Sequence, residues 1–176
     1  KEGNVSYETI EEEIAGVKVS VNIAIQQYST EKSLLENVPQ PPVEIPSSVP
    51  LAHLVTTRVL VPGGVSLPEP VMERLIDRII QAYVEELGIR ELKHVDNGEF
   101  KTESGFDAKY SVYRGVLSKE VVVNVEILSA HWSDDKSTII VVALYPYGDV
   151  VYSGHTIGSI EENMREEVME LIKKVV

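Results

Sequence analysis

The sequence predicts an α+β fold in which an antiparallel sheet of about six or seven strands carries helices packed on both faces. Three stretches lead to this prediction. Residues 69–87 carry an apolar stripe at helical spacing, residues 17–26 alternate apolar and polar side chains, and residues 138–145 are almost wholly apolar. A strand that is apolar on both sides needs cover on both faces of its sheet. A two-layer α/β sandwich is the alternative.

The longer helix is expected between Glu69 and Leu87. Pro70 is tolerated in a first helical turn, and Gly88 suits a left-handed C-cap, so both ends of this helix are signalled. The apolar residues recur at intervals of three and four and form one stripe. They are Met72, Leu75, Ile76, Ile79, Ile80, Tyr83 and Leu87.

The remaining strands are expected on both sides of that helix. Turn-forming residues, including Asn97-Gly98 as a type I′ turn, separate the segments after it into a meander. In residues 121–130, the polar side chains of Asn124 and Glu126 indicate that one face of the strand is partly exposed to water. Residues 146–149 are expected to end the last strand. The expected strands cover residues 17–26, 51–61, 89–95, 99–102, 106–116, 121–130 and 138–145.

The domain organisation is expected to be simple. Residues 1–16 are interpreted as an N-terminal tether or short helix, with the lead-in to a strand as an alternative, and residues 17–176 as a single α+β domain. Residues 29–50 contain five prolines and form a proline-rich surface loop, which is either a recognition loop or a connector between distant parts of the sheet. A second helix is expected from Ser159, where Ser159 and Glu162 fit a capping box. Its buried stripe would comprise Ile160, Met164, Val168, Leu171, Ile172 and Val175.

Composition excludes several classes of function. The 28 acidic and 16 basic residues give a formal charge of −12, which argues against nucleic acid and anionic lipid as partners. No apolar run approaches the ~20 residues of a membrane span. The absence of cysteine rules out disulfides, thiolate metal sites and a cysteine nucleophile. Because the chain starts at Lys1, we expect an extracytoplasmic domain with a possible anchor upstream; a cytoplasmic protein is the alternative.

No catalytic residues, metal ligands or cofactors are predicted. The four histidines lie in different segments, without the spacing of a metal site. His131, Asp134 and Asp135 could bind a hard metal or position a water, but Ser133 to Lys136 has the composition of a hairpin turn, which is the favoured interpretation.

Aromatic residues near the C-terminal end of the sheet are the remaining binding candidates. Aromatic rings combine apolar area with a polar tip and are common at interfaces. The competing interpretation, which we favour, is that they close the edge of the core. The candidates are Trp132, Tyr145, Tyr147, Tyr152 and His155.

Three segments carry a resemblance to a known family. They are Ala24-Ile25-Gln26-Gln27-Tyr28, Thr56-Thr57-Arg58-Val59-Leu60-Val61-Pro62 before an acidic helix, and Val141-Val142-Ala143-Leu144-Tyr145-Pro146 before a C-terminal helix. The chain from about Val17 onward resembles an uncharacterised family of archaeal secreted or lipid-anchored domains, which has no assigned activity. The order of elements also resembles the PsbP-like α/β/α arrangement, whose members are mostly non-catalytic accessory or binding proteins.

These observations favour a non-catalytic extracytoplasmic domain that contacts a protein or cell-surface partner. The alternative is a carrier of a small ligand or metal ion, and a hydrolase built on His131 and Asp134 is a third hypothesis. The sequence does not determine the oligomeric state.

Overall fold

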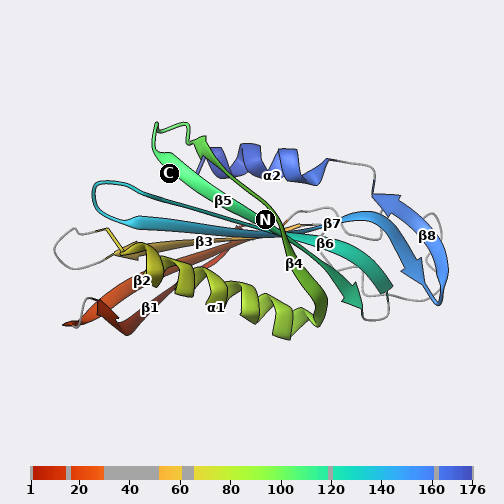
Figure 1. Cartoon of the computed structure of the whole chain (residues 1–176), viewed down its shortest axis with the longest axis horizontal. Coiled ribbons are helices and arrows are strands. Elements are labelled where there is room, and N and C mark those ends of the chain that lie inside the picture. Colours follow the sequence, from red (N-terminus) through yellow and green to blue (C-terminus); the bar gives the residue numbers. More distant parts are fainter. Residues whose placement is uncertain are drawn as a thin grey trace.

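In the computed structural model, eight strands form one sheet against which two helices pack (Figure 1). The structure describes residues 2–14, 17–29, 52–60, 66–118, 121–160 and 163–175, and the counts above refer to these. The elements are β1 (Glu2–Ile14), β2 (Val17–Ser29), β3 (His53–Leu60), α1 (Glu69–Leu87), β4 (Ile89–Lys101), β5 (Asp107–Ser118), β6 (Val121–Ser133), β7 (Thr138–Tyr152), β8 (His155–Ile160) and α2 (Met164–Lys173).

The sheet has the order β1-β2-β3-β7-β6-β5-β4, and β8 pairs with the far end of β7. Every pairing is antiparallel, which confirms the predicted α+β class and the antiparallel sheet. β7 lies between β3 and β6, and its residues 138–146 are all buried. The doubly apolar segment is therefore the central strand, as its composition indicates.

α1 has the predicted bounds. Gly88 has a left-handed φ of 68° and its N–H is bonded to the Val84 carbonyl, as expected of a C-cap. The buried side chains of the helix are Val71, Met72, Leu75, Ile76, Ile80 and Tyr83. α1 packs mainly against β4 and β7, and α2 packs mainly against β7, so the helices do not cover the sheet from edge to edge.

Within the described residues, the sheet has eight strands where seven were expected, because β1 and β8 were not predicted and β4 unites two of the expected strands. Residues 2–14 are strand β1, paired with β2 along its length, rather than a tether or short helix. Glutamate has low strand propensity, and β1 contains five glutamates, which obscured its pairing. The predicted loop at residues 29–50 lies outside the described residues, except for Ser29 at the end of β2.

β4 is one continuous strand, so the predicted turn at Asn97-Gly98 is wrong. Gly98 lies opposite Tyr110, and a Cβ on Gly98 would be 2.7 Å from Tyr110 Cε1. The tyrosine ring thus covers the glycine, as aromatic rings do for glycines near sheet edges. Gly98 serves this close approach and not a turn.

β7 also continues through the residues expected to break it. The pairing of β6 with β7 shifts after Asn124–Tyr147, and Gly148 has a φ of 72°, so residues 146–149 form an irregularity within the strand. β7 then pairs with β8 through a two-residue turn at Ser153-Gly154. Both turn residues have positive φ, 49° and 79°, as a type I′ turn requires.

α2 begins five residues later than predicted. Ser159 and Ile160 belong to β8, and Asn163 caps the helix by accepting a bond from the Glu166 backbone N–H at 3.4 Å. Met164, Val168 and Ile172 are buried as predicted, but Leu171 is 58% exposed. In the described part of the chain, neither helix has both the length and the apolarity needed to cross a bilayer.

Candidate functional site

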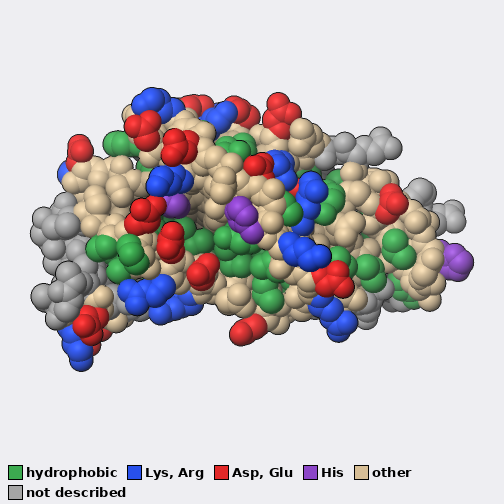
Figure 2. All heavy atoms as spheres, in the orientation of Figure 1, with side chains coloured by type: hydrophobic (Ala, Val, Ile, Leu, Met, Phe, Trp, Pro, Cys, Tyr) green, Lys and Arg blue, Asp and Glu red, His purple; other side chains and the backbone are tan. Residues whose placement is uncertain are grey.

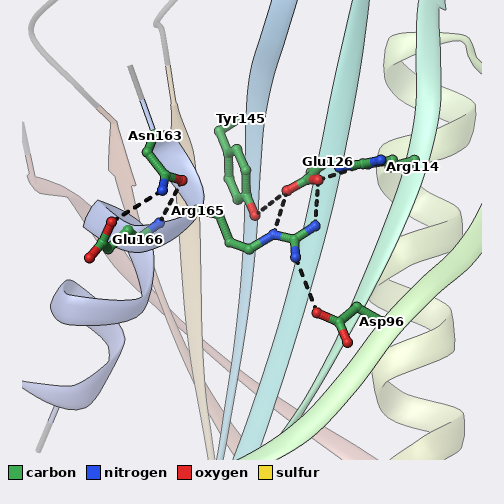
Figure 3. A network of polar contacts seen from close by, with 7 residues as sticks. All are labelled: Asp96, Arg114, Glu126, Tyr145, Asn163, Arg165 and Glu166. Carbon is green, nitrogen blue, oxygen red and sulfur yellow. Dashed lines mark hydrogen bonds and ion pairs between the residues drawn. The ribbon is translucent and has the colours of Figure 1, made fainter. Parts of the chain in front are cut away.

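Among the described residues, the most connected group of polar side chains surrounds Glu126 in β6, where α2 meets the sheet (Figure 3). Glu126 is only 3% exposed, although the sequence indicated a wet face; Asn124, two residues earlier, is exposed. We call this group the Glu126 cluster. Its members are Asp96, Arg114, Glu126, Tyr145 and Arg165.

Strand register and the start of α2 bring these residues together. Arg114 in β5 and Tyr145 in β7 are the direct cross-strand partners of Glu126, so the three side chains share one face of the sheet. Arg165, the second residue of α2, reaches Glu126 from the helix. It also bonds to Asp96 in β4, with 3.1 Å between its Nη1 and the Asp96 Oδ2.

Four donated hydrogen bonds satisfy the Glu126 carboxylate. Oε1 accepts from Arg114 Nε at 2.9 Å and from Arg165 Nη2 at 2.6 Å. Oε2 accepts from the Tyr145 hydroxyl at 2.8 Å and from Arg165 Nε at 3.0 Å. Charged partners of this kind compensate for the loss of water around a buried carboxylate.

The electrostatics keep Glu126 ionised. Burial alone would raise the pKa of Glu126, but the hydrogen bonds from Arg165, Tyr145 and Arg114 outweigh it and hold the pKa below its ordinary value. Burial, and the neighbouring Glu126 charge, raise the pKa of Tyr145. Its hydrogen bond to Glu126 raises the pKa of Arg165 further above its already high value. The cluster therefore holds fixed charges at neutral pH, and Arg165 connects α2 directly to β6 and β4.

A second polar contact lies between β3 and α1. His53 Nδ1 and the Tyr83 hydroxyl are 3.0 Å apart, and their rings meet edge to face. Burial lowers the pKa of His53, partly opposed by Glu86, and burial raises the pKa of Tyr83. Both groups are neutral at neutral pH, so the contact between α1 and β3 is a hydrogen bond between neutral groups and not an ion pair.

The segment around His131 and Asp134 is a hairpin turn, as favoured from the sequence. The Asp134 carboxylate accepts bonds from the backbone N–H groups of Lys136 and Ser137 at 2.8 and 2.6 Å, and it is paired with Arg58 at 3.2 Å. Burial lowers the pKa of His131. Across the residues that the structure describes, no group of three or more histidines and carboxylates is placed to hold a metal ion.

The structure separates the five predicted binding candidates into three places. Trp132 is 3% exposed and lies against Phe100, at 6.5 Å between ring centroids. Tyr145 is 1% exposed within the Glu126 cluster, and Arg114 lies 4.9 Å above the Tyr147 ring, so Tyr145 and Tyr147 meet at one cluster. The other two, Tyr152 and His155, pair with each other at the β7–β8 turn; Tyr152 is partly buried and His155 is exposed.

Sequence reasoning missed an exposed surface formed by β1, β2 and β3, which we call the open sheet face. Residues directly opposite one another in antiparallel strands project to the same side. The rows are Val5–Gln26–Thr56, Tyr7–Ala24–Arg58 and Thr9–Asn22–Leu60. All nine side chains are exposed or partly exposed, whereas Val55, Thr57 and Val59, on the other side of β3, are buried.

The open sheet face has a distinctive chemical character. Tyr7 is 79% exposed, Val5 43% and Leu60 41%. Among these nine residues Arg58 is the only one with a charged side chain, and most of the others are small or uncharged polar residues. The surface visible in Figure 2 carries acidic and basic side chains closely intermixed. The alternation of Val5, Tyr7 and Thr9 was a signal for this face, but the glutamates that follow obscured it.

The fold and the site define a small α+β domain in which a polar cluster around the buried Glu126 fastens a C-terminal helix to an antiparallel sheet. A model for a domain of unknown function, DUF6517, matches residues 1–176, so the chain belongs to this family. No curated protein and no solved structure matches the chain.

Proposed function

We propose that this protein is a non-catalytic, extracytoplasmic binding or accessory domain that contacts a protein partner at the cell surface through the open sheet face. The observation that carries the proposal is the exposure of Val5, Tyr7 and Leu60 on one face that spans three strands. Exposed apolar groups clustered on one surface are typical of interaction sites.

The composition of the face supports a protein partner. Tyrosine supplies a large contact area and a polar tip, and it is enriched at interfaces. The small polar side chains around Tyr7, such as Thr9 and Thr56, suit the polar rim of an interface. Because the face lies on three paired strands, little backbone entropy would be lost when a partner binds.

Glu126 is the only buried carboxylate among the described residues, and we assign it a structural and not a catalytic role. A general acid or base must exchange protons near the working pH, whereas Glu126 is held ionised by four hydrogen bonds. We therefore assign this cluster to fastening α2 and place the binding function elsewhere.

We also propose how the two helices are placed on the sheet. We take α1 and α2 to lie on opposite faces, as in a three-layer PsbP-like arrangement. Arg165 of α2 contacts Glu126, whereas Tyr83 of α1 contacts His53, which lies in the same cross-strand row as Leu144 and Ile127. Glu126 and Ile127 are consecutive in a strand and project to opposite sides.

Photo-crosslinking tests the proposed function. Benzoylphenylalanine would replace Tyr7 in the full-length protein, expressed in its own host, and a matched protein would carry it in place of the exposed Asp107 at the other end of the sheet. We expect a specific adduct from position 7 that Leu60→Glu removes. The proposal fails if position 7 yields no adduct beyond that of position 107.

Protease treatment of intact cells tests the location. An extracytoplasmic domain is degraded while a cytoplasmic marker protein stays intact. Protection of both proteins would contradict this part of the proposal.

A further inference from the structure

We infer that the edge of β1 that faces away from β2 accepts an extended, basic segment of the partner protein as an added antiparallel strand. This inference rests on the proposed function, since it specifies the chemistry of the partner and how the partner begins to bind beside the open sheet face. Three observations support the inference. They are the regularity of β1, its negative charge and its difference from β4 at the opposite edge of the sheet.

β1 is a regular edge strand. It stands at one end of the strand order, and within the described residues it pairs only with β2. Its register with β2 runs without interruption from Val5 to Ile14, and the single irregularity lies between Glu2 and Val5. Along such an edge, alternate backbone N–H and C=O groups point outward and can pair with another strand.

β4, at the opposite edge, is protected against such pairing. Its register with β5 shifts at two places, between Arg90 and Lys93 and between His94 and Asp96. Glu91 has a φ of 55°, which interrupts the extended backbone, and α1 packs against the strand. Irregularities and helical cover are among the means by which proteins block an edge. One edge is blocked and the other is regular.

The charge of β1 selects a basic partner. β1 contains five glutamates and no lysine or arginine, and the Glu11 and Glu13 side chains are exposed. β2 contributes one basic residue, Lys18, which lies opposite Glu13. A second copy of β1 would place another five glutamates beside these, and the repulsion between two strands of the same net charge opposes such pairing. A segment with lysine or arginine would instead gain from each opposed pair.

The order of side chains along β1 predicts a pattern in the partner. On the side of the open sheet face, β1 presents Val5, Tyr7, Thr9, Glu11 and Glu13 in succession. Antiparallel pairing matches the rest of the sheet and is slightly more stable than parallel pairing. From its N-terminus, an antiparallel partner segment of nine residues would then have basic residues at positions 1 and 3 and apolar residues at positions 7 and 9. The other five positions could hold any residue. Its basic residues would face Glu13 and Glu11, and its apolar residues would face Tyr7 and Val5.

A synthetic peptide tests this inference with the full chain. The probe is fluorescein-labelled Lys-Thr-Lys-Thr-Thr-Thr-Val-Thr-Val, and the control is a scrambled peptide of the same composition. Fluorescence anisotropy should show about tenfold tighter binding of the ordered peptide. The double variant Glu11→Lys/Glu13→Lys should lose about tenfold in affinity, whereas Glu99→Lys/Glu103→Lys, with the same change in charge near the β4 edge, should keep it. Equal binding of the two peptides, or equal loss in the two variants, would overturn the inference.

Two N-methylated peptides distinguish strand addition from simple charge attraction. Only alternate N–H groups of an added strand bond to its neighbour. Methylation of the odd-numbered or of the even-numbered amides should therefore abolish binding in one peptide and preserve it in the other. If both methylated peptides bind like the parent, contact is electrostatic only and the inference is wrong. Sedimentation that shows a dimer of the chain, broken by the β1 variant, would also overturn it in favour of a second copy.

The results also separate the inference from the proposed function. If position 7 forms adducts but the ordered peptide does not bind, strand addition at β1 is refuted, while the proposal that the open sheet face binds a partner stands. Peptide binding without any adduct at position 7 would support the edge and refute the open sheet face.

Discussion

Arg165 binds both oxygens of the Glu126 carboxylate, through Nε at 3.0 Å and through Nη2 at 2.6 Å. This paired contact joins the first turn of α2 to the middle of β6, across 39 positions of sequence. An arginine that grips a carboxylate with two N–H groups fixes orientation as well as distance. The contact therefore sets where α2 lies on the sheet.

Replacing Glu126 should destabilise the protein strongly. Glu126→Ala leaves the buried Tyr145 hydroxyl without its acceptor and removes two of the bonds of Arg165, which keeps its bond to Asp96. We expect a loss of about 3 kcal/mol in the free energy of unfolding. Arg114→Met is the control, because the Arg114 side chain is 49% exposed and its ion pair is screened by water, so we expect a loss of about 1 kcal/mol or less. Urea denaturation measures both. Equal losses would contradict the central position of Glu126.

Stability should decrease in acid partly through Glu126. Its pKa in the folded protein lies below the ordinary value of 4.5, so its contribution is complete above about pH 4.5 and is lost as the pH falls through the folded pKa. Glu126→Gln, which cannot ionise, should reduce the slope of stability against pH in this range. Urea denaturation at intervals of pH compares the variant with the unmodified protein. An unchanged slope would show that Glu126 is not held ionised.

The α2 cap distinguishes two possible starts of that helix. Asn163→Ala removes the bonds between the Asn163 side chain and Glu166, and it should cost about 1 kcal/mol. Ser159→Ala should have little effect, because Ser159 is an exposed residue of β8 and not a cap. Thermal denaturation of the two variants gives the order. If Ser159→Ala were the more damaging, the helix would begin where the sequence alone placed it.

Two glycines in the sheet should differ in their tolerance of a methyl group. A Cβ on Gly115 would lie 2.7 Å from Ile89 Cγ2 and 3.1 Å from the Arg90 carbonyl oxygen, and a backbone atom cannot easily move. A Cβ on Gly98 would meet only the end of the Tyr110 ring, which can rotate away. We expect Gly115→Ala to cost about 1–3 kcal/mol and Gly98→Ala less. The reverse order in denaturation experiments would contradict the packing described.

The parts of the fold that could be predicted are those with local signals. α1 was predicted at its observed bounds because its stripe, Pro70 and Gly88 all lie within or beside the helix. The central position of β7 followed from its own composition. Asn97-Gly98 shows the limit of such signals, since its turn preference yields to pairing with β5 and to the Tyr110 ring. Tertiary pairing overrides local preference there.

The Glu126 cluster could not be predicted because its contacts are long-range. Arg114 and Arg165 lie 12 and 39 positions from Glu126, and no spacing rule relates them. A single glutamate within the apolar segment 121–130 was the available signal, and it also fits a wet strand face. The open sheet face was missed for a related reason, since it depends on recognising β1 as a strand and on the register of three strands.

The measurement that tests the account most directly compares crosslinking at position 7 in two variants. Leu60→Glu changes the open sheet face, while Glu126→Gln changes only the buried cluster on which α2 depends. Both proteins would be assayed at a temperature where circular dichroism shows them folded. We predict that Leu60→Glu abolishes the adduct and Glu126→Gln preserves it. Loss of the adduct in Glu126→Gln and its persistence in Leu60→Glu would contradict the central claim.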